Sequence, residues 1–346
     1  TLNRPYNDIV YDIKIHGYIE PITVTEDHPI FVLTKSFCSI EGRNRYLEKN
    51  GRNFRICKPT CTYTKKYRNC AKYYQFYKPE WKQAKDLTTD DVLVFPKNKN
   101  FLPIDEIVQH SGLEKEIVTS PDFWRLVGYW LAEGSARIYL NKKKFNIIEF
   151  TFGSKENDYI NDINEIICKF FKRKLSIEKY GNARRIRIYD KKLCNFLLQF
   201  KDHKEGHSWI KKIPGWVERI PNKLQRELIL GYFYGDGCKG KIYTITSISL
   251  SVLKSIQRML LNFNIYSSIY LFREEGKIIN ILGRECKSKK TYCILIGKQF
   301  FENIKKSERV WFDTNFVYIP IQSINKKRFE GCVYNLEVEN DESYCS

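Results

Sequence analysis

The sequence predicts an α+β domain of two similar halves, inserted in a second domain that is mostly β. An apolar helix that ends in a carboxylate and a glycine occurs twice, as LVGYWLAEGS at 126–135 and ILGYFYGDGC at 229–238. Strand, helix and strand patterns follow each copy. Short runs with strand patterns dominate residues 1–100 and 307–346. Together these patterns are typical of two domains, each with its own core.

Composition limits the function classes. The 346 residues are 42% hydrophobic and carry a net charge of +19. A packed core is therefore expected, and the positive charge favours a polyanionic partner, most simply nucleic acid. No apolar run reaches the ~20 residues that span a bilayer, and no signal peptide opens the chain. We expect a non-secreted protein, cytoplasmic or nuclear, with reduced cysteines and no membrane partner.

A cysteine-rich insert at 35–79 interrupts the N-terminal strand patterns IVYDIKI, ITVT, IFVL and VLVFP. Four thiols in a short stretch of a non-secreted protein suggest a tetrahedral Zn²⁺ site. The spacing is not a double C-x-x-C pattern, so four unrelated thiols remain the alternative. Basic and aromatic residues in the insert would let it contact DNA phosphates. The candidate zinc ligands are Cys38, Cys57, Cys61 and Cys70.

Residues 101–118 are interpreted as a linker. The two helices that end in a carboxylate follow it. The first is apolar nearly all round, which predicts burial. Gly128 and Ala132 lie four residues apart on one face, and Gly231 and Gly235 hold the same places in the second copy. Small residues on matching faces predict that the two helices pack closely against each other.

The helix pair would bring Glu133 and Asp236 side by side at its C-terminal end. A helix C-terminus carries partial negative charge, and two adjacent carboxylates repel each other. A hard cation between them relieves both costs, and oxygen ligands with open water positions suit Mg²⁺. The alternative is a glycine-rich helix stop with an exposed acid. Its repetition 103 positions later argues against that alternative.

The elements after each copy repeat as well. FTFGS at 150–154, a helix at 158–171 and IRIY at 186–189 follow the first copy, and YTITS at 243–247, a helix at 250–261 and SSIYLF at 267–272 follow the second. This repeat predicts a pseudo-two-fold pair of half-domains whose dyad passes between the carboxylates. Duplex DNA has the same symmetry.

On these motifs, residues 123–304 resemble the LAGLIDADG homing endonucleases in their two-motif, monomeric form. The resemblance implies two pseudo-symmetric αββαββα halves at 119–306 that cleave both strands of DNA at a specific site. It implies that Glu133 and Asp236 hold two or more Mg²⁺ ions, although this family more often has Asp at the first position. Within SWIKKIPGWV, Lys211 matches the family's lysine near the metals, and Lys212 is the adjacent alternative. An ordinary surface lysine is the competing interpretation.

Base-reading residues are expected to alternate along strands, because side chains on one face of a sheet recur every second residue. Arginine fits guanine in a bidentate way, and any of these residues could equally contact phosphate. The candidate DNA-binding residues are Arg137, Lys155, Arg184, Arg185, Arg187, Lys239 and Lys241.

The flanks, 1–100 and 307–346, resemble the Hint splicing domain of inteins. Residues 25–28 (TEDH), the strand–turn–strand at 81–96 and VYNLEVENDESY at 333–344 match blocks of that family. The resemblance implies that Thr25 and His28 assist the first splicing step and that Asp341 assists a later one. A histidine can protonate the peptide nitrogen near neutral pH.

Neither splice junction of that family is present, so we expect autocatalytic splicing only in a complete parent flanked by host exteins. The alternatives are a DNA-binding module of the same fold that does not cleave, and a degenerate splicing element.

Overall fold

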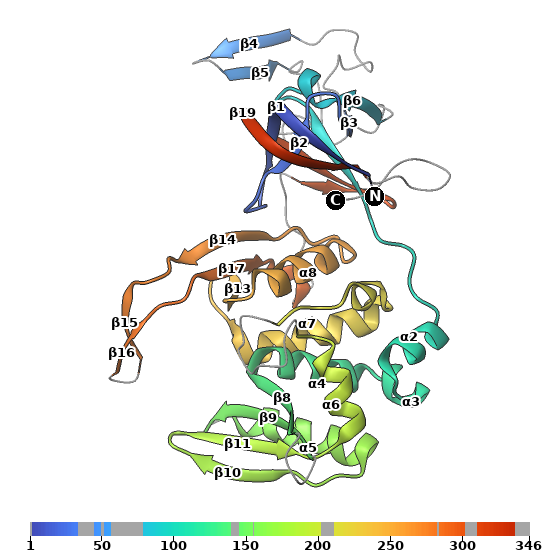
Figure 1. The fold of residues 1–346 in the computed structure, drawn as a ribbon, viewed down its shortest axis with the longest axis vertical. Helices are drawn as coiled ribbons and strands as arrows, with labels where there is room; N and C mark the ends of the chain where they lie inside the picture. Colours follow the sequence, from blue (N-terminus) through green and yellow to red (C-terminus); the bar gives the residue numbers. More distant parts are fainter. Residues whose placement is uncertain are drawn as a thin grey trace. The chain divides into compact units, whose positions relative to one another are not determined.

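The fold comes from a computed structural model. It describes residues 2–33, 45–49, 52–56, 79–139, 145–154, 156–201, 211–281, 284–301 and 310–335 (Figure 1). The chain divides into two compact units, one formed by residues 1–97 and 305–346 and the other by residues 98–304. Within the described ranges, none of the helices is long and apolar enough to cross a membrane.

The first unit is a sheet with the strand order β2-β1-β19-β7-β3-β6, and β18 pairs with β19 at its side. Its strands are β1 (Leu2–Ile15), β2 (Ile22–Thr25), β3 (Pro29–Leu33), β6 (Glu80–Gln83), β7 (Val92–Pro96), β18 (Trp311–Phe312) and β19 (Phe316–Asn335). β1 and β19 pair antiparallel over the whole of β1, so chain segments from both ends of the sequence share one sheet. A short 3-10 helix, η1 (Ala84–Asp86), and the hairpin of β4 (Arg45–Lys49) and β5 (Arg52–Ile56) complete the elements described here.

Residues 101–118 are part of the second unit, so the prediction of a linker was wrong. They form α2 (Ile104–Ser111) and α3 (Lys115–Val118), joined at Gly112, whose φ is +66°. Ile107 and Val118 are fully buried, and Trp124 Nε1 donates to Val118 O at 2.8 Å. The apolar residues are spaced for one face of each short helix, and burial of those faces against the unit holds the segment in place.

The first half of the second unit follows the predicted element order. Its elements are α4 (Pro121–Glu133), β8 (Gly134–Tyr139), β9 (Phe145–Gly153), α5 (Asn157–Phe171), β10 (Ser176–Tyr180), β11 (Ala183–Ile188) and α6 (Lys191–Leu198). The strand order is β8-β9-β11-β10. The apolar face predicted for α5 is buried, and α5 packs in the same half as α4.

The second half repeats this order. Its elements are η3 (Gly215–Arg219), α7 (Asn222–Asp236), β12 (Gly237–Cys238), β13 (Tyr243–Ser247), α8 (Leu250–Leu261), β14 (Ser268–Arg273), β17 (Thr291–Ile296) and η4 (Lys298–Phe300). The strand order β12-β13-β17-β14 corresponds, position by position, to that of the first half. The halves differ at their C-terminal ends, because the 3-10 helix η4 follows β17 where α6 follows β11 in the first half.

A two-stranded arm distinguishes the second half further. β15 (Ile278–Ile281) and β16 (Arg284–Lys287) extend the β14–β17 hairpin well beyond the sheet (Figure 1). The arm was not predicted from the sequence. Ser288 holds its base, since its hydroxyl donates to Glu274 O at 2.7 Å.

Candidate active site

Two glycines allow α4 and α7 to touch backbone to backbone. A Cβ added at Gly128 would lie 2.2 Å from Leu228 O, and one added at Gly231 would lie 2.1 Å from Arg125 O. Farther along, a Cβ at Gly235 would lie 2.4 Å from the Cβ of Ala132. The predicted small-residue faces therefore meet each other, and no larger side chain fits between the helices.

Both helices end at their carboxylates, but the glycines that follow are not left-handed caps. Gly134 and Gly237 have extended backbones, with φ of −99° and −91°, and lead directly into β8 and β12. A Cβ at Gly134 would lie 2.3 Å from Trp130 Cδ1, and one at Gly237 would lie 2.2 Å from Phe233 O. Glycine is required here because the strand turns back tightly against its own helix.

The structure brings Glu133 and Asp236 together at the end of the helix pair. Burial, and then the charges of Asp236 and Glu156, raise the pKa of Glu133 to about 7. Burial also raises the pKa of Asp236 to about 6, against the opposing effects of the Lys211 ammonium and the Tyr232 hydroxyl. Both shifts have the cause expected when two carboxylates share a poorly solvated site.

Lys211 lies at the same site and contacts the end of α4. Its Nζ donates to Leu131 O at 2.9 Å, to Trp130 O at 3.0 Å and to Ala132 O at 3.4 Å. Burial lowers the pKa of Lys211 to about 8, although both carboxylates raise it. The ammonium therefore satisfies the last carbonyls of α4, where a positive charge is favourable.

Of the two candidate lysines, Lys211 is the one whose charge acts on both carboxylates. The main-chain N–H of the next residue, Lys212, donates to Phe200 O at 2.9 Å. Adjacent residues of an extended segment point to opposite sides, which separates the two side chains.

A second buried lysine, Lys201, was not predicted from the sequence. Its Nζ donates to Ala136 O at 3.0 Å, and its backbone forms an isolated antiparallel bridge with Lys211. The two ammonium groups lie 5.9 and 5.2 Å from the centre of the Trp130 ring. Together they hold the α4–β8 junction on either side of Glu133. Lys201 lies shortly after α6 in a lysine-rich chain, and that position gave no signal of burial.

The two carboxylates differ in their support. The buried Tyr232 hydroxyl lies beside the Asp236 carboxylate and lowers its pKa, and it donates to Ser247 Oγ at 3.0 Å. The corresponding tyrosine of α4, Tyr129, instead donates to Asp162 at 3.0 Å. That aspartate belongs to an ion-pair network in which Arg125 of α4 contacts Asp162 of α5 at 2.7 Å and Glu227 of α7 at 2.8 Å. This network ties the two halves together.

The predicted DNA-binding arginines of the first sheet lie on two faces. Arg185 and Arg187 share the open face with Arg137 of β8, whereas Arg184 lies on the helix side, where its Nη1 donates to Asn157 of α5 at 2.5 Å. Adjacent strand residues alternate between the two faces of a sheet, so the three arginines of β11 do not share one face, and their contact with DNA stays a prediction.

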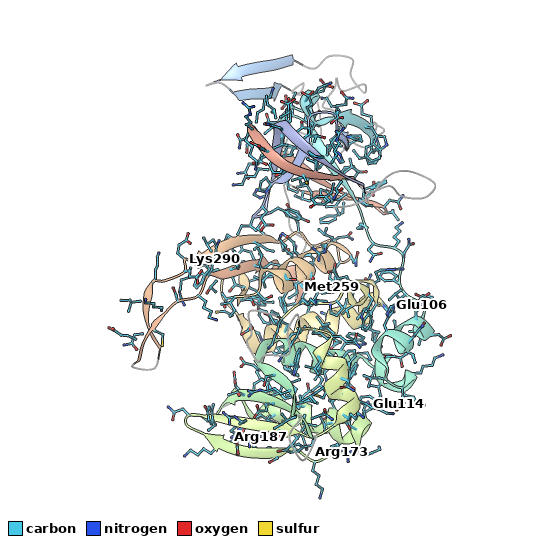
Figure 2. All side chains as sticks on the ribbon, viewed as in Figure 1. Glu106, Glu114, Arg173, Arg187, Met259 and Lys290 are labelled. Atoms are coloured by element: carbon cyan, nitrogen blue, oxygen red, sulfur yellow. The ribbon has the colours of Figure 1, made fainter. Side chains whose placement is uncertain are left out.

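Two of the remaining nucleic-acid candidates lie in one turn. Lys239 and Lys241 are exposed in the turn between β12 and β13. Lys155 lies outside the described residues. The unpredicted arm adds further basic residues, and Lys290 lies at its base (Figure 2).

In the first unit, Thr25 and His28 lie in one turn between β2 and β3. The main-chain N–H of His28 donates to Thr25 O at 3.2 Å, and Thr25 Oγ1 donates to Asp27 at 2.7 Å. Burial lowers the pKa of His28, although the Asp27 charge opposes this. Asp341 lies outside the described residues, as do Cys38, Cys57, Cys61 and Cys70. Among the residues that are described, no group of three or more His, Cys, Asp or Glu is placed to hold a metal.

Comparison with protein families gives one match, over the second half. Residues 223–297 match the family model of the LAGLIDADG-like domain. This part of the chain therefore resembles a LAGLIDADG-like domain. The match begins in α7 and ends just after β17, so it includes Asp236 and the sheet of the second half. The matching strand order of the first half extends the same α+β fold to residues 121–198.

Longer relatives match nearly the whole chain. An uncharacterized protein of Methanocaldococcus jannaschii is 28% identical over 99% of this chain and 44% of its own length. The ATP-dependent DNA helicase Hel308 of Thermococcus kodakarensis is 24% identical over 99% of this chain and 32% of its own. An iron-sulfur cluster assembly SufBD family protein of Mycobacterium tuberculosis is 26% identical over 93% of this chain and 34% of its own. The chain thus spans less than half the length of these relatives.

The solved structures that are similar to this chain include the homing endonuclease I-DmoI. A mesophilic variant is 16% identical, covers 54% of this chain and 88% of its own, and has a TM-score of 0.40.

Proposed function

We propose that the second unit is a site-specific endonuclease that hydrolyses both strands of duplex DNA with the help of Mg²⁺. The observation that carries the proposal is the pairing of Glu133 and Asp236 at the ends of two glycine-packed helices, with one sheet beside each helix. A two-fold arrangement of this kind fits two scissile phosphates related by the symmetry of the duplex. The net charge of +19 supports DNA as the partner, and the site needs only one copy of the chain.

The two carboxylates suit an open site for hard divalent cations better than a site in which protein ligands fill every coordination position. Burial raises the pKa of both carboxylates, and the Asp236 charge raises that of Glu133 further, which a bound cation would reverse. With Glu133 and Asp236 as the carboxylates of the described residues that would hold the metal, several coordination positions are left for water and phosphate oxygens, as Mg²⁺ prefers. The metal would supply activation of a water and stabilisation of the leaving oxyanion.

The neighbouring residues would act on the metal ligands. Lys211 caps α4 and balances the charge of both carboxylates, which fixes the position of Glu133. Tyr232 holds Asp236 through its hydroxyl. The alternative function, DNA binding without cleavage, would make little use of two partly buried acids whose mutual repulsion destabilises the fold.

Strand-resolved cleavage tests this function. A supercoiled plasmid carrying a target selected by binding is incubated with the whole chain and Mg²⁺, and both strands are followed. Wild type should linearise the plasmid, whereas Glu133→Gln and Asp236→Asn should each leave one strand intact. Binding of the target without cleavage of either strand by wild type would establish the non-cleaving alternative instead.

We also infer that the first unit is a Hint-type protein-splicing domain and that the nuclease is embedded in an intein. Relatives with names as different as a helicase and an iron-sulfur cluster assembly protein share a segment like this chain, over about a third of their length. A segment shared in this way is typical of an inserted element. β1 and β19, which lie on either side of the nuclease unit in the sequence, form one sheet, and Thr25 and His28 share a turn.

Splicing is tested in the complete parent polypeptide with its host exteins. The expected result is a ligated extein product detected by mass spectrometry, lost in His28→Ala and retained in Glu133→Gln. A parent that remains unspliced with both native junctions present would favour a degenerate splicing element.

A further inference from the structure

The open faces of the two sheets in the second unit differ in chemistry. In the first sheet, Phe150, Ile186 and Ala136 face the helices and are fully buried. Their strand neighbours, which alternate with them, form the opposite face. By register, Glu149 lies opposite Arg187, and Arg185 lies opposite Glu178.

These four residues form a continuous ion-pair lattice. Arg187 contacts Glu149 and Glu178, each at 2.9 Å, and Arg185 contacts Glu178 at 3.6 Å and Glu149 at 3.9 Å. The guanidinium carbon of Arg185 also lies 3.6 Å from the centre of the Tyr180 ring. The side chains are thereby held in defined positions above the sheet; Arg187 is labelled in Figure 2.

Stability does not account for this lattice. Partly exposed ion pairs contribute little to folding stability. A surface that binds phosphate backbone would also carry few acids, yet here two glutamates reduce the charge of Arg137, Arg185 and Arg187 to a net +1. Donors and acceptors that alternate at fixed positions instead match the edges of bases.

The open face of the second sheet has mostly uncharged side chains where that of the first sheet has ion pairs. By register, Thr246, Cys293 and Tyr270 form one row across it. The neighbouring row contains Thr244, Leu295 and Ser268. Among the described residues of these strands, only Arg273, at the far end of β14, brings a charge to this face.

We propose that the first sheet reads G·C base pairs in the major groove, and that the second sheet reads mainly A·T pairs. The proposal rests on the proposed DNA-binding function and names the kind of site. Arg185 and Arg187 present paired donors to guanine O6 and N7, and Glu149 and Glu178 accept from cytosine N4. Threonine methyl groups and Leu295 suit the thymine methyl. The target is then asymmetric, with one G·C-rich half.

Selection from a library of randomised duplexes tests the proposal, using the whole chain without divalent metal so that binding alone is measured. Wild type should recover sites with fixed G·C pairs in one half. Arg187→Gln should weaken the preferred guanine about 5- to 150-fold, the range of one bidentate contact, and shift the preference there toward adenine. Glu178→Gln should relax a cytosine in the same half, which provides a second variant if the first folds poorly.

Arg184→Gln is the matched control, because it removes the same charge from the same strand on the opposite face. It should leave base preferences unchanged. The inference is overturned if neither half is G·C-rich, or if Arg184→Gln alters the selected bases as Arg187→Gln does. A wild-type chain that binds no duplex would overturn the proposed function as well, so the two failures are distinguishable.

Discussion

The carboxylate pair should make the metal-free protein less stable as pH rises. Glu133 and Asp236 have folded-state pKa values of about 7 and about 6, against ordinary values of 4.5 and 3.8. The folded state therefore holds these protons more tightly than the unfolded state. Their stabilising effect is complete below about pH 4 and is lost as the pH rises through about 7.

The size of the effect follows from these values. At 1.36 kcal/mol per pH unit, the two shifts amount to at most about 6 kcal/mol. The two groups share a site and Glu133 keeps some contact with solvent, so about 3 kcal/mol is expected. For a unit of this size, that corresponds to a decrease in Tm of about 6–12 °C.

Thermal unfolding in EDTA at pH 5.5 and pH 7.5 measures the effect. The matched control is the double variant Glu133→Gln, Asp236→Asn. Its Tm depends on pH through every other titrating group, such as His28, but not through the carboxylate pair. The Tm of wild type minus that of the control should fall by a little under half of the stated amount between the two pH values, because the rest is already lost below pH 5.5. Mg²⁺ at pH 7.5 should restore most of the difference. A difference that is flat or rises with pH would refute the proposed electrostatics.

Three further results are expected. Gly231→Ala should lower the free energy of unfolding by about 3 kcal/mol in denaturant titration, since its Cβ would meet Arg125 O at 2.1 Å. Gly215→Ala is the control and should cost little, because a Cβ there has nothing within 4 Å. Equal losses of stability in the two variants would contradict the close helix packing. Lys201→Met should slow cleavage of one strand about tenfold, so that nicked plasmid accumulates; equal slowing of both strands would mean that Lys201 acts only on overall stability. Log affinity for duplex DNA should fall steeply with log salt concentration, and a flat dependence would exclude a phosphate-dominated interface.

The sequence was most informative where one periodic pattern determined one element. α8 spans Leu250–Leu261, the range predicted from its apolar spacing, and α5 differs by one residue at its start. The paired glycines of α4 and α7 likewise predicted which helix faces meet. In each case, local spacing and burial favoured the same structure.

Other features depended on tertiary contacts that spacing does not encode. The helices within 101–118 are short, and burial against the rest of the unit stabilises them. Lys201 is buried because Ala136 O and the Trp130 ring surround its ammonium. Arg184 was grouped with Arg187 by composition, whereas the register of β11 places them on opposite faces.

Mn²⁺ binding measured by electron paramagnetic resonance tests the central claim most directly, because it reports cation occupancy without requiring cleavage. Wild type is predicted to bind Mn²⁺ at pH 7.5 in competition with Mg²⁺, and the Glu133→Gln, Asp236→Asn variant to lose those ions while still binding duplex DNA. Equal Mn²⁺ binding by the two proteins would contradict the assignment of the carboxylate pair as the metal site.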